Sequence, residues 1–151
     1  MARHTCDSLL FAAARPPAPG ERWADVGSGA GFPGLVLASC FPLTRFTLIE
    51  PNGRKAGFLQ LEISSLGLGN AEVSPRRLQE VDGGFDVAAA RALAAPGEAL
   101  FTLKSLVRVG GSVIVAAGRE EHTPSGAERV QLEAVGGVDS PGVLFMMSRE
   151  A

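Results

Sequence analysis

The sequence predicts a single α/β domain built on a parallel sheet, and three observations support this fold class. Strand-like and helix-like segments alternate over residues 22–117, a pattern typical of βαβ units with right-handed crossovers. A glycine-rich segment, WADVGSGAGFPG, contains the end of the first strand and the turn after it. Residues 118–151 instead contain two strand-like segments around GGVDSPG, which predicts an antiparallel pair at the end of the sheet.

The expected elements follow from apolar periodicity and from the glycines and prolines between apolar segments. Strands are expected at residues 22–26, 45–50, 71–73, 85–90 and 112–117, and as a final pair at 130–135 and 143–148. Helices are expected at 33–39, 54–66 and 99–107, with Gly110 and Gly111 turning the chain into the fifth strand. Residues 118–128 are expected to be a loop. We expect one domain with an N-terminal helix and linker (1–20), a cofactor-binding core (21–117) and a C-terminal strand pair (118–151).

Composition limits the class of protein. Of 151 residues, 46% are hydrophobic and 20% are charged, which indicates a globular domain with a buried core. The formal net charge of -2 excludes a polycation held on nucleic acid by its overall field, so RNA binding would need a local basic patch. The two cysteines and two histidines lack the spacing of metal ligands, so no metal is expected.

Membrane attachment and secretion are not expected. No apolar run approaches the roughly 18 residues that span a bilayer. The apolar run 9–14 is too short for a signal peptide, and Asp7 interrupts the approach to it. We therefore expect a cytoplasmic protein.

The glycine-rich segment is placed where ligands bind in open α/β sheets, between the first strand and the next helix. Gly29, Gly31 and Gly34 satisfy the dinucleotide pattern G-x-G-x-x-G, but that match alone is weak. The charge of Asp25 would oppose a pyrophosphate, and Pro33 removes a backbone N–H that phosphate oxygens would need. A ligand with an amino group and a sulfonium, such as S-adenosyl-L-methionine, suits the segment better.

Glu50 ends the second expected strand and supports an adenosine-containing ligand. A carboxylate at this position can accept hydrogen bonds from both ribose hydroxyls. Because NAD and S-adenosylmethionine share this ribose, Glu50 does not distinguish them. The alternative is that Asp25 and Glu50 are only polar ends of strands, and we favour the cofactor interpretation.

Five segments resemble one known family in order and spacing. They are RHTCDSLL from Arg3, DVGSGAGFPGLVLA from Asp25, TLIEPNGRKAGFLQ from Thr47, LGLGNAEV from Leu66 and ARALA from Ala90. Together they resemble the bacterial small-subunit (16S) ribosomal RNA guanine-N7 methyltransferases, the glucose-inhibited division protein B family. The resemblance covers about residues 3–118. It implies a Rossmann-like class I S-adenosylmethionine-dependent methyltransferase fold with a mostly parallel seven-stranded sheet.

The resemblance also implies roles for individual residues. Gly27 and Phe32 would lie against the cofactor, Glu50 would hold the ribose, and Leu78 with Gln79 would approach the adenine. Arg91 would face both the cofactor and the target and is the predicted catalytic residue. The alternative role for Arg91 is that of a strand-end arginine paired with a surface carboxylate. The whole expected cofactor set is Asp25, Gly27, Ser28, Gly29, Gly31, Phe32, Glu50, Leu78, Gln79 and Arg91.

The chemistry favours a ring nitrogen as methyl acceptor. Guanine N7 carries a free lone pair, so methyl transfer needs positioning rather than a base. Exocyclic amine methylation commonly uses an Asn/Asp-Pro-Pro-aromatic element after the fourth strand, where this chain reads ARALA. Metal-assisted O-methylation would need a carboxylate cluster, which the sequence lacks.

The expected partner is ribosomal RNA or the small ribosomal subunit, with the protein a monomer. Eight cations are candidates for phosphate contacts near the carboxyl edge of the sheet: Arg3, Arg15, Arg54, Lys55, Arg76, Arg77, Arg91 and Arg119. The alternative is a scatter of solvated side chains. A small-molecule methyltransferase, a non-catalytic S-adenosylmethionine-binding relative and, less favoured, an NAD(P)-dependent reductase stay open.

Three departures from the family pattern bear on RNA docking. The resemblance starts at the RH…DS element, without the helical extension that usually precedes it. Where the family usually has a lysine and a glycine just after the fifth strand, this chain has Ala117 and Gly118, so the lysine is missing. The final strand pair is also short. We expect each departure to weaken RNA docking more than cofactor binding.

Overall fold

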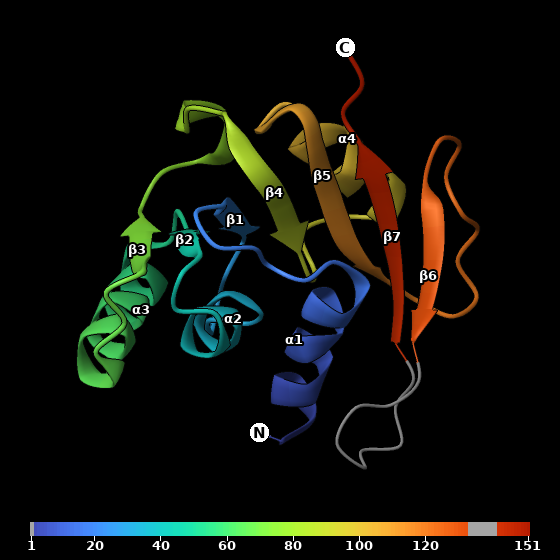
Figure 1. The fold of residues 1–151 in the computed structure, drawn as a ribbon. Helices are drawn as coiled ribbons and strands as arrows, with labels where there is room; N and C mark the ends of the chain where they lie inside the picture. The colour runs from blue at the N-terminus through green and yellow to red at the C-terminus, as the bar shows by residue number, and fades with distance from the viewer. Residues whose placement is uncertain (1, 133–141) are drawn as a thin grey trace.

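A computed structural model describes residues 2–132 and 142–151 of the chain. Its centre is a seven-stranded sheet with the spatial order β3-β2-β1-β4-β5-β7-β6 (Figure 1). The strands are β1 (Arg22–Val26), β2 (Arg45–Ile49), β3 (Ala71–Ser74), β4 (Phe85–Ala90), β5 (Val107–Ala117), β6 (Glu128–Leu132) and β7 (Gly142–Ser148).

The first five strands are parallel, as the alternating pattern predicts. β1 pairs in parallel with both β2 and β4, and the pairs β2–β3 and β4–β5 extend the sheet on either side. The strand order therefore reverses between β1 and β4. The carboxyl edge at that reversal is where open α/β sheets place their ligands.

Helices cover both faces of this sheet. The helices are α1 (Ala2–Ala14), α2 (Gly34–Cys40), α3 (Gly53–Leu66) and α4 (Pro96–Leu103). Leu10 of α1, Leu37 of α2 and Leu59 of α3 belong to one buried apolar cluster. Leu100 of α4 belongs to a second cluster, on the opposite face. None of the described helices is both long and apolar enough to span a membrane.

Local sequence signals explain where the helices begin and end. The expected helix at 33–39 begins one residue later, because Pro33 is the cap before α2. α3 begins at Gly53, one residue early, because the Asn52 side chain accepts hydrogen bonds from the backbone N–H groups of Arg54 and Lys55. Gly67 ends α3 in the left-handed conformation, as its position predicts.

The prediction for the segment before the fifth strand was wrong. The expected helix 99–107 is α4, which starts at Pro96 and ends at Leu103. Gly110 and Gly111 do not precede the strand but lie inside β5, which starts at Val107. Phe85 is opposite Val107, whereas Val87 is opposite Ser112, so β5 bulges between these two pairs.

Backbone hydrogen bonds to Arg149 explain this bulge. The Gly110 N–H donates to the Arg149 carbonyl, and the Arg149 N–H donates to the Gly111 carbonyl. A Cβ on Gly111 would lie 2.9 Å from the carbonyl oxygens of Arg108 and Asp86. The glycines therefore permit a close strand contact that a local turn rule does not predict.

The predicted antiparallel pair is present at the end of the sheet. β7 pairs antiparallel with both β5 and β6. β6 begins at Glu128 rather than residue 130, and residues 133–135 of the expected strand lie outside the described residues. A short 3-10 helix, Leu78–Glu80, was not predicted; it is the next element after β3.

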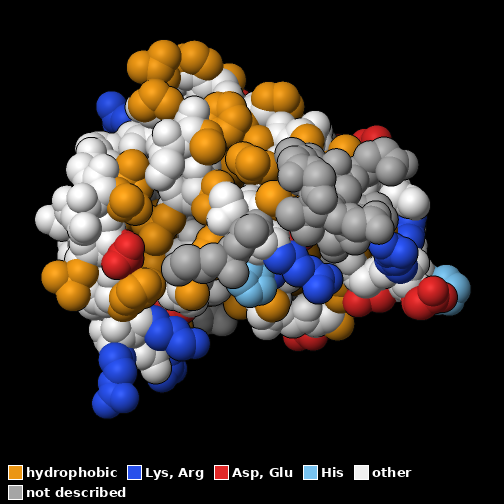
Figure 2. Space-filling model, turned by 90° about the horizontal axis from the view of Figure 1, so that it is seen from below, with side chains coloured by type: hydrophobic (Ala, Val, Ile, Leu, Met, Phe, Trp, Pro, Cys, Tyr) orange, Lys and Arg blue, Asp and Glu red, His pale blue; other side chains and the backbone are white. Residues whose placement is uncertain are grey.

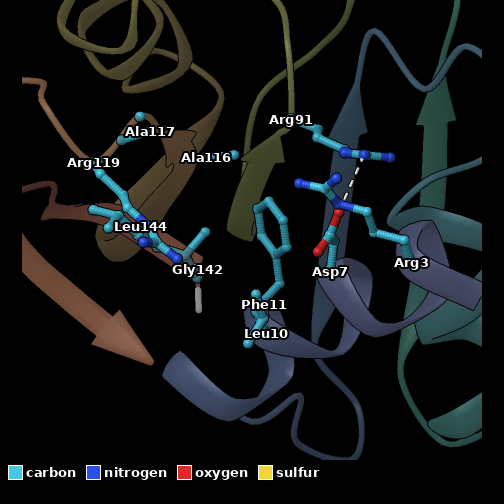
Figure 3. A pocket seen from close by; sticks show the side chains of 12 residues that line it. Arg3, Asp7, Leu10, Phe11, Arg91, Ala116, Ala117, Arg119, Gly142 and Leu144 are labelled. Carbon is cyan, nitrogen blue, oxygen red and sulfur yellow. Dashed lines mark hydrogen bonds and ion pairs between the residues drawn. The ribbon is translucent and has the colours of Figure 1, made fainter. Parts of the chain in front are cut away.

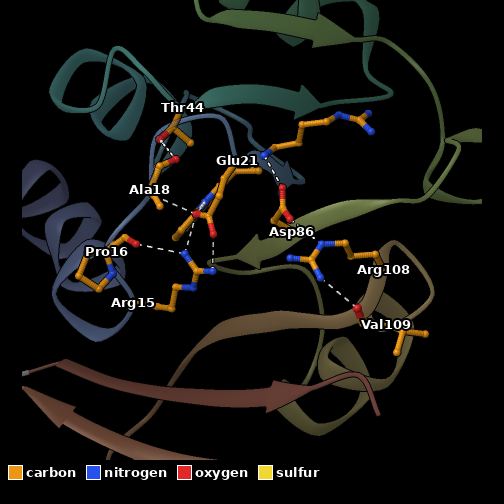
Figure 4. A network of polar contacts seen from close by, with 10 residues as sticks. Arg15, Pro16, Ala18, Glu21, Thr44, Asp86, Arg108 and Val109 are labelled. Atoms are coloured by element: carbon orange, nitrogen blue, oxygen red, sulfur yellow. Dashed lines mark hydrogen bonds and ion pairs between the residues drawn. The ribbon is translucent and has the colours of Figure 1, made fainter. Parts of the chain in front are cut away.

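A polar network closes the amino edge of the sheet, opposite the ligand-binding edge (Figure 4). Arg15, just after α1, forms two hydrogen bonds of 2.6 Å with the Glu21 carboxylate. Asp86 at the start of β4 accepts a hydrogen bond from the Arg22 N–H and pairs with Arg108. Arg15 was among the cations considered for RNA contact at the carboxyl edge, and the structure places it at the other edge.

Candidate active site

The glycine-rich segment forms a tight loop around the Asp25 carboxylate at the end of β1. Asp25 is 3% exposed, and its Oδ2 accepts hydrogen bonds from Ser28 Oγ at 2.5 Å and from the Gly34 N–H at 2.9 Å. A Cβ on Gly34 would lie 2.6 Å from that oxygen and 2.9 Å from Leu48 Cγ. Gly34 is therefore needed for close packing, and Asp25 anchors both ends of the loop, a role that the sequence analysis did not predict.

The other carboxylate oxygen of Asp25, Oδ1, lies in a different environment. Oδ1 is buried and has no hydrogen-bond partner among the described residues. Burial raises the pKa of Asp25 to about 6; the hydrogen bonds from Ser28 and Gly34 oppose this shift, and the nearby Glu50 charge adds to it. A buried carboxylate with an unpaired oxygen suits a ligand that brings a positive charge or an N–H donor.

Glu50 joins the glycine loop to the start of α3. It follows β2, is 5% exposed, and accepts hydrogen bonds of 3.0 Å from the Gly29 N–H at Oε2 and from the Asn52 N–H at Oε1. Each carboxylate oxygen has a second lone pair for a further donor. Glu50, the predicted ribose-binding residue, is thus held beside the glycine loop, and each of its oxygens can accept one more hydrogen bond. This arrangement fits a ligand with two adjacent hydroxyl groups.

Other predicted cofactor residues surround the same strand ends. A Cβ on Gly27 would lie 3.3 Å from Leu93 Cδ1, so the segment after β4 lies against the glycine loop. The Phe32 ring contacts the His4 ring of α1, with centroids 5.6 Å apart. Leu78 and Gln79 lie in the 3-10 helix after β3, with Leu78 partly buried and Gln79 exposed.

A cavity of about 410 Å³ lies between α1 and the strands β4, β5 and β7 (Figure 3). Arg3 and Arg91 are on the same side of it as Asp7, and Arg119 is across from them. The lining residues are Arg3, Asp7, Leu10, Phe11, Arg91, Ala116, Ala117, Gly118, Arg119, Gly142, Val143 and Leu144. Three cations and one carboxylate make this cavity a suitable place for a ligand with acceptor groups or negative charge.

Contacts from α1 hold Arg91 in the wall of this cavity. One terminal nitrogen of its guanidinium donates to His4 Nδ1 at 2.6 Å and lies 3.4 Å from Asp7 Oδ2. The strand-end arginine thus has a carboxylate partner, as the alternative interpretation required, and it also lines the cavity. Arg3 and Asp7 are one helical turn apart, so helical spacing in the RH…DS element could have identified this wall of the cavity.

Cationic side chains on the end of the molecule where α1 begins form separate groups. Figure 2 shows several Lys and Arg groups there, one beside a histidine, with hydrophobic and uncharged atoms between them. Among residues 2–132 and 142–151, no group of three or more His, Cys, Asp or Glu side chains is placed to hold a metal ion.

Solved structures that share this fold include methyltransferases. A SAM-dependent methyltransferase from Aquifex aeolicus matches with a TM-score of 0.69 and 19% identity, covering 97% of this chain and 93% of that one. A putative methyltransferase from Escherichia coli matches with a TM-score of 0.70 and 19% identity, covering 99% and 87%. The chain has the Rossmann-like fold of the class I S-adenosylmethionine-dependent methyltransferases.

Sequence comparison then identifies the family. The family model GidB, described as rRNA small subunit methyltransferase G, matches residues 1–141. Ribosomal RNA small subunit methyltransferase G of Stenotrophomonas maltophilia is 39% identical over 118 residues, which are 77% of this chain and 51% of that protein. The protein of the same name from Halorhodospira halophila is 40% identical over 117 residues, covering 77% and 54%.

This chain belongs to the GidB family of rRNA small subunit methyltransferase G, which confirms the resemblance seen in its motifs. It spans about half the length of the curated relatives that it matches.

Proposed function

We propose that this chain is an S-adenosyl-L-methionine-dependent methyltransferase that methylates the N7 of a guanine in small-subunit (16S) ribosomal RNA. Membership of the GidB family over residues 1–141 is the observation that carries this proposal. We further propose that residues 1–151 form one methyltransferase domain that acts as a monomer in the cytoplasm.

The cofactor side of the proposed site is the loop between β1 and α2 together with the ends of β2 and β3. S-adenosylmethionine, when bound, supplies a methyl group that is electrophilic because of its sulfonium. Glu50 would accept hydrogen bonds from the ribose, and Leu78 with Gln79 would border the adenine. Gly27, Gly31 and Phe32 would lie along the ligand, while Asp25 and Ser28 keep the loop closed.

The acceptor side is the cavity lined by Arg91. Because guanine N7 already has a free lone pair, the protein has no proton to remove and must only orient the base. Rate then depends on holding N7 in line with the methyl group at about 3–3.5 Å. Arg91 is held by His4 and Asp7 and would orient the acceptor, and the charges of Arg3 and Arg119 would attract RNA phosphate.

Calorimetric titration of the protein with S-adenosylmethionine, S-adenosylhomocysteine and NADH tests the cofactor assignment. We expect binding of the first two ligands, no binding of NADH, and loss of most of this affinity in Asp25→Ala, because the loop loses its anchor. A methyl-transfer assay on undermodified small-subunit RNA then tests the acceptor.

Three results would contradict the proposal. Binding of NADH alone, or tighter cofactor binding by Asp25→Ala, would favour the reductase alternative. Methyl transfer whose rate does not change with salt concentration would favour a small-molecule acceptor, since RNA phosphate contacts are salt-dependent.

A further inference from the structure

A second groove, of about 270 Å³, lies between the glycine loop and α3. Its lining residues are Gly29, Ala30, Arg54, Lys55 and Phe58. The first two belong to the loop of the proposed cofactor site, and the other three belong to the first turns of α3. The groove therefore adjoins the proposed cofactor site on the side away from the Arg91 cavity.

α3 presents an aromatic ring to solvent at this groove. The helix buries Ala56 and Leu59 against the sheet, whereas Phe58 is 46% exposed and Leu61, almost one turn further on, is 71% exposed. Phe58 is four residues after Arg54 and three after Lys55, so the ring and both cations share one face of the helix. The exposed ring and the two cations therefore lie together on the side of the helix that lines the groove.

The two cations at the groove have no acidic partner among the described residues. Arg54 and Lys55 are exposed, and neither forms an ion pair within the described part of the chain. None of the described residues that line the groove is acidic. The carboxylate of nearby Glu50 is buried, and both of its oxygens accept hydrogen bonds from backbone N–H groups. In a chain with a net charge of -2, this is a local positive site.

We propose that this groove binds an unpaired nucleotide of the RNA that flanks the target guanine, with its base stacked on Phe58 and its phosphate beside Arg54 and Lys55. Proteins recognise unpaired RNA by stacking bases on aromatic side chains and by pairing phosphates with cations. A second copy of this chain fits less well, because a symmetric contact would bring these cations toward their own copies. The inference rests on the proposed function, since it takes RNA as the substrate.

The test measures RNA binding and cofactor binding separately. Fluorescence anisotropy with a labelled single-stranded RNA of about 12 nucleotides compares wild type with Phe58→Ala, Phe58→Leu and the double variant Arg54→Gln, Lys55→Gln. Leu61→Ala is the matched apolar control outside the groove. Arg45→Gln is the matched charge control, because Arg45 starts β2 at the opposite edge of the sheet. Calorimetry with S-adenosylhomocysteine is repeated on every protein.

We expect both Phe58 variants to weaken RNA binding by about 5- to 150-fold, because leucine keeps the apolar volume but removes the stacking surface. The double variant should weaken binding and flatten its salt dependence by about 0.7 in logarithmic slope for each lost phosphate contact. The two controls should bind RNA like wild type, and every variant should keep its affinity for S-adenosylhomocysteine.

Two outcomes would overturn the inference alone. They are wild-type RNA affinity in Phe58→Leu, and losses of RNA affinity in the two controls that equal those in the groove variants. Failure of the proposed function is distinguishable from these, because it appears as a wild type that binds no S-adenosylhomocysteine or no RNA.

Discussion

Gly34 shows how one residue determines the shape of the proposed cofactor loop. The space where a Cβ would stand is filled by the Asp25 carboxylate and by Leu48, and the Gly34 N–H donates to that same carboxylate. The glycine pattern predicted a ligand-binding loop, but the packing reason for this glycine lies in residues that are 9 and 14 positions away along the chain.

Gly34→Ala should therefore destabilise the protein by about 1–3 kcal/mol, because the added methyl group overlaps Asp25 and Leu48. Urea denaturation followed by circular dichroism measures this change. Gly57→Ala on α3 is the control: its Cβ would meet nothing within 4 Å, and alanine in a helix interior should stabilise by about 0.5–1 kcal/mol. Equal stability of the two variants would show that the loop relaxes around the methyl group.

At the scale of elements, Glu21 fixes how α1 joins β1. Its carboxylate accepts hydrogen bonds from Arg15, the Ala18 N–H and Trp23 Nε1. The hydrogen bonds from Arg15 are the main reason why the pKa of Glu21 falls to about 2. The network fixes the linker between α1 and β1. It thereby sets the direction of α1, whose amino-terminal half lines the Arg91 cavity.

Glu21→Gln should lower stability at pH 7 by about 1–2 kcal/mol, because charge-assisted hydrogen bonds become neutral ones. Because the folded-state pKa lies below the ordinary value of 4.5, the stabilisation is complete above about pH 4.5 and is lost as the pH falls toward 2. Denaturation curves between pH 2 and 7 should thus converge for variant and wild type at the acid end. Glu72→Gln, at an exposed position on β3, is the control, and a gap that persists at pH 2 would contradict the argument.

At the scale of the whole molecule, the proposed acceptor cavity collects residues from the first to the last elements. Arg3 and Asp7 come from α1, Arg91 follows β4, Arg119 follows β5, and Leu144 lies on β7. The antiparallel insertion of β7 beside β5 brings the start of β7 beside α1 (Figure 1). The cavity therefore exists only when α1 and the strands β4, β5 and β7 have come together.

Arg91→Lys tests whether the geometry of this cavity, and not only its charge, matters. Lysine keeps the charge but replaces the guanidinium, one nitrogen of which contacts both His4 and Asp7, by an ammonium on a stem of different length and geometry. We expect kcat/KM for methyl transfer to RNA to fall at least about tenfold, and affinity for S-adenosylhomocysteine to fall much less. Arg108→Lys, in the ion pair at the amino edge, is the control and should transfer methyl groups like wild type. Equal losses of transfer and cofactor affinity would assign Arg91 to cofactor binding alone.

The sequence by itself determined the features that depend on neighbours along the chain. The alternation of strands and helices, the glycine loop after β1, the Gly67 cap and the final strand pair all follow from apolar periodicity and from turn and cap residues. The position of Glu50 beside the loop also follows, since parallel strands end at a common edge.

Only the tertiary structure decided the features that depend on pairing between distant segments. The bulge of β5 arises from contacts with Arg149 and Asp86, and Arg15 lies at the amino edge because Glu21 binds it there. Likewise, only the folded chain brings His4 and Asp7 to Arg91. These contacts join residues up to 87 positions apart, and no periodicity or local propensity encodes which side chains meet across that separation.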